Sequence, residues 1–528
     1  MLDLIVKNGT VIDGTGRAGF LADVAVRDGR IVDIAALPHA TAATELDATG
    51  LVVTPGFIDI HSHSDFTLLV DPRAHSAIAQ GVTTELVGNC GHGCAPIVDI
   101  EAAKGNIYGY VPQTPVTWTS TSGYLGQMDA AQPAVNLVTL VPNGLLRIAV
   151  MGRTGRPATA EERREIARLL EEALAAGAAG FSVGLEYAVE QACTREEMAE
   201  LCALVARYDG LFASHTRNRV GLALEAIDEV LDVSAASNVR LHIPHIIPRR
   251  GGPPDADVRS LERVDRALAR GQDVSLDMHT RLHGFTYLAA ALPAWASEGG
   301  PEALRERLGD TATRGAIARH ESLITSFGLG GWDRVFLVTG RRPEFVGKSF
   351  QEIAKSRGTS PFDAVLDVLR DEADDPYAPM VMCESYREAQ LLPAYRHSAG
   401  MVASDATTLC LDGPLAASVF HGAFTWASWF FRRFVREERA FTLEQAVRKL
   451  TGQPAQRLRL ADRGILRAGA WADISAFDPA IFGERGTLDR PNQLAQGMVH
   501  VVVNGIVEVS HGTFTGRRGG RVLRHRRG

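Results

Sequence analysis

Cysteines are scarce in this sequence, and long apolar runs are missing. The 528 residues include six cysteines, scattered without the spacing of a disulfide framework, so we expect a reducing, cytoplasmic setting. No stretch approaches about 20 consecutive apolar residues, so the sequence predicts no membrane-spanning helix. The opening MLDLIVKNGTVIDGTG lacks the basic and apolar segments of a signal peptide, and we expect it to belong to the folded protein.

An excess of positive charge is also missing. The formal net charge is −7 at pH 7, which argues against a general nucleic-acid binder. Hydrophobic residues make up 45% and charged residues 22%, as in ordinary globular proteins, and the length exceeds that of a typical single domain. We therefore expect a small-molecule ligand as the partner, with no nucleic acid and no membrane; a homo-oligomer is compatible with the sequence.

The two ends of the chain share a strand-rich texture. Short alternating segments are separated by turn signals such as Asp28-Gly29 near the start and Asn504-Gly505 near the end. Each end alone is short for a stable sheet. We predict one small β-sandwich domain built from residues 1–54 and 465–528.

Between these ends, short apolar strands alternate with helical patterns. The candidate strands are Gly56–His61, Thr84–Asn89, Val135–Val141, Ala179–Leu185, Leu211–His215, Arg240–His245, Asp273–His279 and Met401–Asp405. Eight such strands with intervening helices predict an α/β fold, a (β/α)₈ TIM-like barrel over residues 55–464. The region from about 284 to 345 is longer than one helix requires, and we predict an insertion near the barrel mouth.

The strongest functional signal is the segment GFIDIHSHSD, an apolar strand that ends in His61 and His63. Residues two apart in a strand point to the same side. Both imidazoles can therefore face the carboxyl-terminal mouth of the barrel, where barrel enzymes place their catalytic groups. Neutral imidazoles are good zinc ligands, so the pattern predicts two adjacent ligands from one strand.

Further candidate ligands stand at the ends of other predicted strands. Cys90, in Gly88-Asn89-Cys90-Gly91, offers a soft thiolate, with Cys94 as its rival. His215 ends its strand, and His245 is preferred to His242 because it lies nearer the carboxyl end of the next one. Asp405 ends the last strand and is a candidate for both metal ligand and general base. The metal set predicted from the residues is thus His61, His63, Cys90, His215, His245 and Asp405.

The ordered set of motifs resembles the D-aminoacylases, the N-acyl-D-amino-acid deacylases of the metal-dependent amidohydrolase superfamily. The resemblance runs from VKNGTVIDGTG through GFIDIHSHSD, GVTTELVGNCG, SHTRN and ASDAT to GILRAGAWADISAFD. It implies a tight zinc site at Cys90, His215 and His245, and a weaker second metal site at His61 and His63. The predicted fourth strand has no lysine to bridge two metals, so any bridging anion should be Cys90.

The resemblance also implies the chemistry. We expect an amide C–N bond to be cleaved by metal-activated hydroxide, with Asp405 as general base and then general acid. Tyr187, in Gly184-Leu185-Glu186-Tyr187, is favoured over Asn143 to stabilise the oxyanion. The expected substrate is an N-acyl-D-amino acid or a related N-acyl compound.

The segments that contact substrate in the family differ here. The arginine of the family's HPR-x-YG segment corresponds to Val419, and its YPY segment to His279-Thr280-Arg281. Replacing an arginine by valine removes the charge that pairs with a carboxylate. The predicted substrate-binding residues are Asn143, Arg217, His279, Arg281 and His283, and Arg217 and Arg281 are the candidates to replace the missing arginine.

Two other functions remain open from the sequence. The same metal chemistry fits a non-carboxylate amide, a cyclic amide, a carbamate or a lactone. A non-catalytic assembly protein is the least favoured alternative, because such a relative is expected to lose metal ligands and all six are present.

Overall fold

The two ends of the chain meet in one β-sheet. The computed structural model describes residues 1–525, and the predicted range 465–528 therefore ends outside them. Nine strands form this sheet in the order β21-β20-β19-β18-β5-β1-β2-β3, with β4 beside β1. Their bounds are β1 Leu2–Val11, β2 Phe20–Arg27, β3 Arg30–Ala35, β4 Ala42–Asp47, β5 Val52–Pro55, β18 Ile474–Phe477, β19 Met498–Val503, β20 Ile506–Ser510 and β21 Thr513–Phe514.

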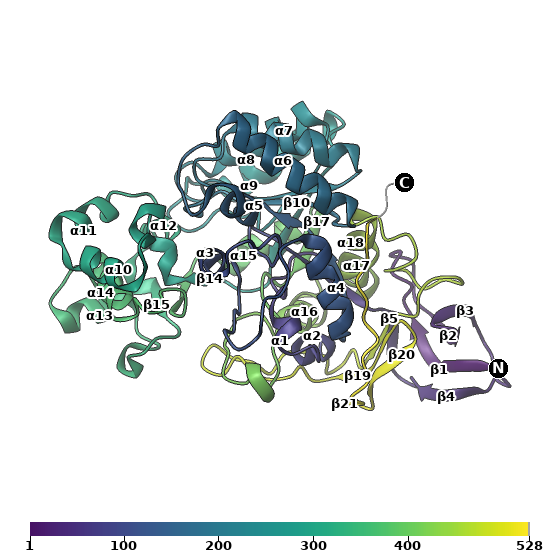
Figure 1. The fold of residues 1–528 in the computed structure, drawn as a ribbon. Coiled ribbons are helices and arrows are strands. Elements are labelled where there is room, and N and C mark those ends of the chain that lie inside the picture. Colours follow the sequence, from purple (N-terminus) through teal and green to yellow (C-terminus); the bar gives the residue numbers. More distant parts are fainter. Residues whose placement is uncertain (526–528) are drawn as a thin grey trace.

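Tight turns and one strand pairing account for this arrangement. Asp28 and Gly29 have φ of 51° and 72°, and Asn504 and Gly505 have φ of 50° and 81°, the left-handed geometry that two-residue hairpins require. Antiparallel pairing of β5 with β18 joins the N-terminal strands to the C-terminal ones. This sheet lies at the right of Figure 1, beside the N-terminus.

The middle of the chain forms two parallel sheets. One has the order β6-β7-β8 and the other β17-β13-β12-β11-β10-β9. Each of the eight predicted strands overlaps a strand in these sheets, with β8 and β9 together covering the third. Their bounds are β6 Phe57–Asp59, β7 Val82–Val87, β8 Asn136–Thr139, β9 Val141–Pro142, β10 Gly180–Gly184, β11 Leu211–His215, β12 Arg240–Ile243, β13 Val274–His279 and β17 Gly400–Ala403.

Backbone hydrogen bonds link the two parallel sheets at both edges. On one side only Leu140 separates β8 from β9, and the N–H of Ala179, just before β10, donates to the Thr139 carbonyl of β8 at 2.8 Å. On the other side, beyond β6 and β17, Asp405 N–H donates to the His61 carbonyl at 2.8 Å and His63 N–H to the Ala406 carbonyl at 2.8 Å. The second seam therefore passes directly through predicted site residues.

Helices connect most of these strands. They are α1 Thr67–Val70, α2 His75–Ile78, α3 Ile100–Ala103, α4 Thr121–Ala131, α5 Asn143–Met151, α6 Ala160–Ala175, α7 Arg195–Arg207, α8 Ala223–Ser237, α9 Ala256–Ala269, α15 Glu388–Arg396, α16 Trp426–Phe430, α17 Leu443–Leu450 and α18 Gly452–Arg457. Helices α6 and α7 both start at a threonine capping box, Thr159 with Glu162 and Thr194 with Glu197. In Figure 1, α6 to α9 lie together at the top.

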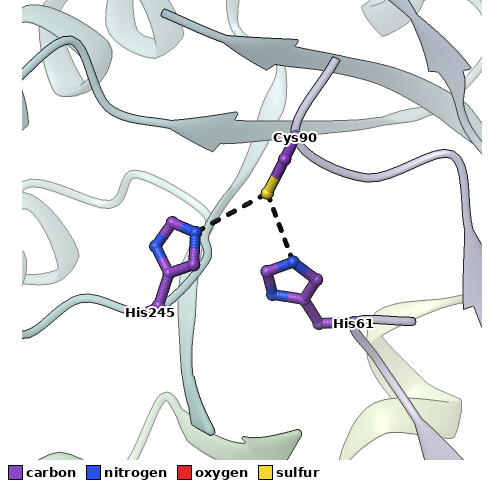
Figure 2. A group of neighbouring side chains, drawn as sticks. All are labelled: His61, Cys90 and His245. Carbon is purple, nitrogen blue, oxygen red and sulfur yellow. Dashed lines mark hydrogen bonds between the residues drawn. The ribbon is translucent and has the colours of Figure 1, made fainter. Parts of the chain in front are cut away.

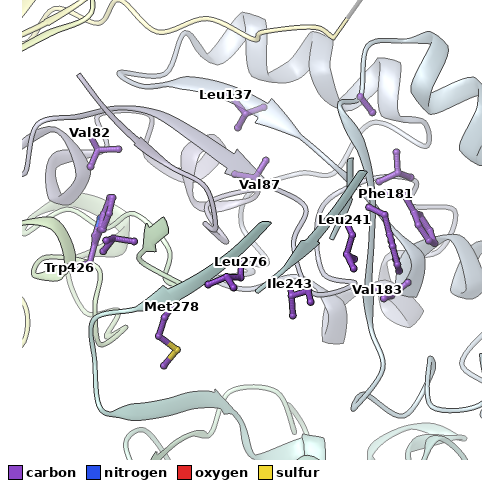
Figure 3. Close-up of a cluster of buried hydrophobic side chains, with 14 of the residues drawn as sticks. Val82, Val87, Leu137, Phe181, Val183, Leu241, Ile243, Leu276, Met278 and Trp426 are labelled. Carbon is purple, nitrogen blue, oxygen red and sulfur yellow. The ribbon is translucent and has the colours of Figure 1, made fainter. Parts of the chain in front are cut away.

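The parallel strands are buried on both faces. Val87, Leu137 and Phe181 belong to the large cluster that also contains helix residues (Figure 3), whereas their neighbours Leu86 and Val138 belong to a second cluster. Each such buried side chain contributes about 1.5–3 kcal/mol to folding. This two-sided packing is typical of parallel strands covered by helices, and it fixes the strand ends that carry the site.

A separate excursion lies between β13 and β17. It contains an antiparallel sheet in the order β14-β16-β15, and its hydrophobic cluster also includes residues outside the excursion, such as Tyr187 and Phe420. Its elements are β14 His283–Tyr287, α10 Gly300–Gly309, α11 Thr311–Ala318, α12 Leu323–Gly328, β15 Val335–Leu337, α13 Phe350–Arg357, α14 Pro361–Asp371 and β16 Met380–Glu384. The excursion runs past residue 345, the predicted end of the insertion, and α10 to α14 lie at the left of Figure 1.

Within residues 1–525, no helix is both long enough and apolar enough to cross a bilayer.

Candidate metal centre

Three predicted ligands converge just beyond the carboxyl ends of parallel strands. His61 follows β6, Cys90 follows β7 and His245 follows β12, and all three are buried. Cys90 Sγ lies 3.2 Å from His61 Nε2 and 3.6 Å from His245 Nε2 (Figure 2). Their ligand atoms all lie within 4.8 Å of one another, close enough to share one ion. Nitrogen and sulfur donors together are typical of a zinc site.

The backbone at these ligands is unusual. Cys90, His245 and Asp405 have φ of 54°, 38° and 46°, a left-handed region that non-glycine residues rarely adopt. Such conformations persist only where the surrounding structure enforces them, and they concentrate at functional sites. Gly91 is required for packing as well, because a Cβ there would lie 1.8 Å from Glu190 Oε1.

A second group shares His61 with the first. His63 Nε2 lies 3.3 Å and His61 Nε2 3.5 Å from Asp405 Oδ1, and these ligand atoms also fit within 4.8 Å. The arrangement agrees with the expectation that His61 and His63 face the same side. It differs from the predicted grouping. The group that contains Cys90 and His245 has His61 as its third member, whereas His215 was predicted there.

His215 makes a different contact. Its Nε2 lies 2.6 Å from Glu186 Oε2, and it belongs to neither ligand group among the described residues. Its ring still packs near that of His245, with centroids 4.6 Å apart, and its Nδ1 is buried without a partner. Burial lowers the pKa of His215 to about 4, so the ring is neutral at neutral pH. Glu186 also receives two hydrogen bonds from Arg249, at 2.9 and 2.7 Å.

Asp277, on β13, contacts two members of the first ligand group, and it was not predicted as a site residue. Its carboxylate lies 3.1 Å from His61 Nδ1, accepts the His245 backbone N–H at 2.8 Å, and lies 2.9 Å from His242 Nε2. Burial alone would raise the pKa of Asp277, but His61 and His242 outweigh it and lower the pKa. An ionised carboxylate only accepts hydrogen bonds, so His61 carries its hydrogen on Nδ1 and directs Nε2 at Cys90.

Asp405 is held as an anion by its surroundings. Arg281 Nη2 donates to Asp405 Oδ2 at 2.7 Å, and His279 Nε2 lies 3.7 Å from the same oxygen. Burial would raise the pKa of Asp405, but Arg281 and His61 prevail and hold it well below its usual value. A carboxylate that stays ionised at neutral pH can accept a proton.

The chemistry of these groups fits a zinc ion. Burial would lower the pKa of His61, but Cys90, Asp277 and Asp405 together raise it, so the surroundings favour a positive charge at this point. Burial raises the pKa of the Cys90 thiol, and a metal cation beside it would reverse that effect. Cys94 is buried but belongs to neither ligand group among the residues described.

A small cavity of about 20 Å³ lies against both ligand groups. It is lined by His63, Cys90, Tyr108, Tyr187, His215, Arg219, His245, Arg249, His279, Gly284, Phe285, Leu323, Phe327, Tyr386, Asp405 and Phe420. Phe285, Leu323 and Phe327 come from the excursion, which therefore helps to cover the site. Tyr187 lines this space, and its hydroxyl lies 3.2 Å from the Tyr108 hydroxyl.

The predicted substrate-binding residues lie in different places. His279 lines the cavity, and Arg281 donates a hydrogen bond to Asp405, which also lines it. Arg217 instead binds Glu229, with Nε to Oε2 at 3.0 Å, and Asn143 Nδ2 donates to Glu190 Oε2 at 2.9 Å. His283, on β14, is half-buried, and none of these last three belongs to the described cavity lining.

Comparison with known proteins agrees with this geometry. A model of the amidohydrolase family matches residues 44–508. The chain is 32% identical to a D-aminoacylase of Alcaligenes xylosoxydans xylosoxydans, over 99% of this chain and 97% of the relative. It is 34% identical to an N-acyl-D-glutamate deacylase of the same organism, over 99% and 96%.

A solved structure extends the likeness to three dimensions. The N-acyl-D-glutamate deacylase of Bordetella bronchiseptica, complexed with zinc and a phosphonate mimic of the tetrahedral intermediate, superposes with a TM-score of 0.81. It is 29% identical in sequence, and the match covers 99% of both chains.

Proposed function

Because this chain belongs to the amidohydrolase family, and within it to the D-aminoacylase group, we propose that it hydrolyses N-acyl-D-amino acids to a carboxylic acid and a free D-amino acid. It is an enzyme, a hydrolase of non-peptide C–N bonds, like its named relatives. The observation that carries the proposal is the convergence of His61, Cys90 and His245 beside an ionised Asp405, at a cavity lined by Cys90, His245 and Asp405.

We infer zinc as the metal, held most tightly by His61, Cys90 and His245, with His63 and Asp405 as ligands of a second, weaker site. His215 packs against His245, and its buried Nδ1 has no hydrogen-bond partner, so this nitrogen is a further candidate ligand for the same centre. When bound, zinc lowers the pKa of a water molecule and polarises the amide carbonyl.

The chain's own residues supply proton transfer and orientation. Asp405 takes the proton of the attacking water and returns it to the leaving nitrogen. Arg281 keeps this carboxylate ionised, and the 2.7 Å hydrogen bond from its Nη2 to Asp405 Oδ2 fixes the orientation of the carboxylate. Tyr187, whose hydroxyl lies 3.2 Å from that of Tyr108, donates a hydrogen bond to the oxyanion as the carbonyl becomes tetrahedral.

We further propose a closed (β/α)₈ barrel, with the terminal strands forming the small β domain and the excursion forming the insertion at its mouth. The hydrogen bonds at both seams between the parallel sheets support closure. A cytoplasmic location and a homo-oligomeric state stay predictions from the sequence.

Val419 favours a second candidate, hydrolysis of an uncharged amide, cyclic amide, carbamate or lactone. It stands where the family's arginine is expected, and it lines a neighbouring cavity rather than the one above the metal ligands. Carboxylate recognition therefore cannot come from this position.

The test is hydrolysis of a panel of N-acetyl-D-amino acids, N-acetyl-L-amino acids, uncharged amides and lactones by the zinc-loaded enzyme. We expect turnover of the D-amino-acid derivatives. Asp405→Asn should retain the tightly bound zinc and lose about 10²–10⁴-fold in kcat. Asp412→Asn, an exposed aspartate paired with Arg73, is the control and should match the wild type. Turnover of only uncharged compounds would contradict the proposal.

A further inference from the structure

Arg219 is a buried cation without an acidic partner. The residue is only 5% exposed, and its guanidinium forms no ion pair within 4.0 Å among the described residues. The other buried arginines all have one: Arg147 with Glu197, Arg240 with Asp209, Arg249 with Glu186, Arg457 with Asp273 and Arg463 with Asp473. A buried charge without a counterion is strongly unfavourable, so its retention calls for an anion from outside the chain.

Neutral groups fix the guanidinium in place. Its Nη2 donates to the carbonyl oxygens of His245 at 2.5 Å and Ile247 at 3.1 Å, and to the Tyr386 hydroxyl at 2.7 Å. Its Nε and Nη1 make no hydrogen bond within residues 1–525, and neither is among the fully buried unpartnered atoms. Three N–H donors therefore remain for a ligand.

Arg219 lines the cavity that holds the candidate metal ligands, together with Cys90, His245 and Asp405. In an N-acyl amino acid, three bonds separate the acyl carbon from the carboxylate carbon, so the two lie within about 4 Å of each other. A substrate whose amide is at the metal must therefore place its carboxylate in this same small space.

The two other arginines near the cavity are already neutralised. Arg249 donates to Glu186 at 2.9 and 2.7 Å, and Arg281 donates to Asp405 at 2.7 Å. Within the described residues, Arg219 alone brings an uncompensated positive charge to the cavity lining.

We propose that Arg219 binds the carboxylate of the N-acyl amino acid and so takes over the role of the arginine absent at Val419. This specificity assignment rests on the proposed deacylase function. Arginine suits it because a planar guanidinium donates several aligned hydrogen bonds to a carboxylate.

The experiment compares N-acetyl-D-leucine with N-acetyl-D-leucinamide, which lacks the carboxylate, by measuring acetate release. For Arg219→Met we expect kcat/KM for the acid to fall on the order of 100-fold, the effect of about two hydrogen bonds to a charged group. The value for the amide should change less than about threefold. Arg219→Lys keeps the charge and should fall between the two. Arg250→Gln, an arginine that binds Glu384 away from the cavity lining, is the matched control.

Zinc content and the melting temperature of each variant are measured alongside. Equal losses for acid and amide would show that Arg219 only supports the His245 segment, and would overturn the assignment while leaving the deacylase function intact. If Arg219→Met fails to fold, the acid-to-amide ratio of Arg219→Lys decides in the same way. Wild-type turnover of the amide but not the acid would instead contradict the deacylase function itself.

Discussion

Replacing Asp277 by asparagine should weaken zinc binding although Asp277 is not a ligand. Its Oδ2 lies 3.1 Å from His61 Nδ1 and 2.9 Å from His242 Nε2, while Oδ1 accepts the His245 N–H at 2.8 Å. An amide nitrogen at the Oδ2 position would push the His61 hydrogen onto Nε2, the atom that faces Cys90. An amide nitrogen at the Oδ1 position would face the His245 N–H, donor against donor.

Either orientation of the asparagine therefore disturbs a metal ligand. Carboxylates that orient a ligating histidine typically account for 10- to 100-fold in metal affinity. We expect the zinc Kd of Asp277→Asn to rise by about 10- to 100-fold, equivalent to about 1.4–2.7 kcal/mol. The assay is competition between the metal-free protein and a chromophoric chelator, with folding checked by circular dichroism.

Ser275→Ala is the matched control. Ser275 Oγ lies 2.8 Å from His242 Nδ1, one residue further from the metal ligands, so its loss should leave the zinc Kd within about twofold. A folded Asp277→Asn variant with the wild-type Kd would refute the reasoning, because it would mean that the tautomer of His61 does not depend on this carboxylate.

Three other predictions test the surroundings of the site. Arg281→Met should move the acidic limb of the kcat/KM profile to higher pH, since Arg281 lowers the pKa of Asp405 and activity requires the ionised form; an unmoved limb would remove Asp405 as the base. Arg249→Met should lower the free energy of unfolding by about 3–5 kcal/mol at pH 7, because it leaves Glu186 buried and charged. Arg249 lowers the pKa of Glu186, so this stabilisation is present above the unfolded pKa of about 4.3 and is lost on acidification; urea denaturation at pH 7 and pH 4 should give a smaller difference at pH 4. Tyr187→Phe should lower kcat by about 10²–10³-fold with little change in KM, and steady-state kinetics showing an unchanged kcat would exclude it as the oxyanion donor.

Strand periodicity predicts the positions in the site that depend on local geometry. His61 and His63 are two residues apart, and both reach Asp405 Oδ1, as alternation predicts, although β6 itself ends at Asp59. The same alternation places Asp277, two residues before His279 on β13, on the side of the strand that His279 faces, but Asp277 lies inside the strand and not at its end, where ligands are expected. The local pattern therefore contains the information needed for this position.

Contacts made by loops could not be read in this way. Arg217 follows His215 closely in sequence, yet its side chain turns away to Glu229 on α8, whereas Arg219 faces the cavity. Both arginines lie beyond the end of β11, where side-chain direction no longer follows a fixed period. Their roles are set by which carboxylates the fold brings near them, and that is information about distant segments of the chain.

The distribution of counterions separates the roles of the three arginines around the cavity. Arg281 acts on Asp405, and Arg249 stabilises Glu186, so the charge of each is directed at a protein carboxylate. If Arg219 had a similar partner, a substrate carboxylate would have to displace it and would gain little. Because neutral carbonyl and hydroxyl groups hold Arg219, its charge is fixed in position but remains uncompensated until a ligand arrives. The free energy released by pairing that charge is therefore available only to an anionic substrate, which makes the position selective as well as attractive.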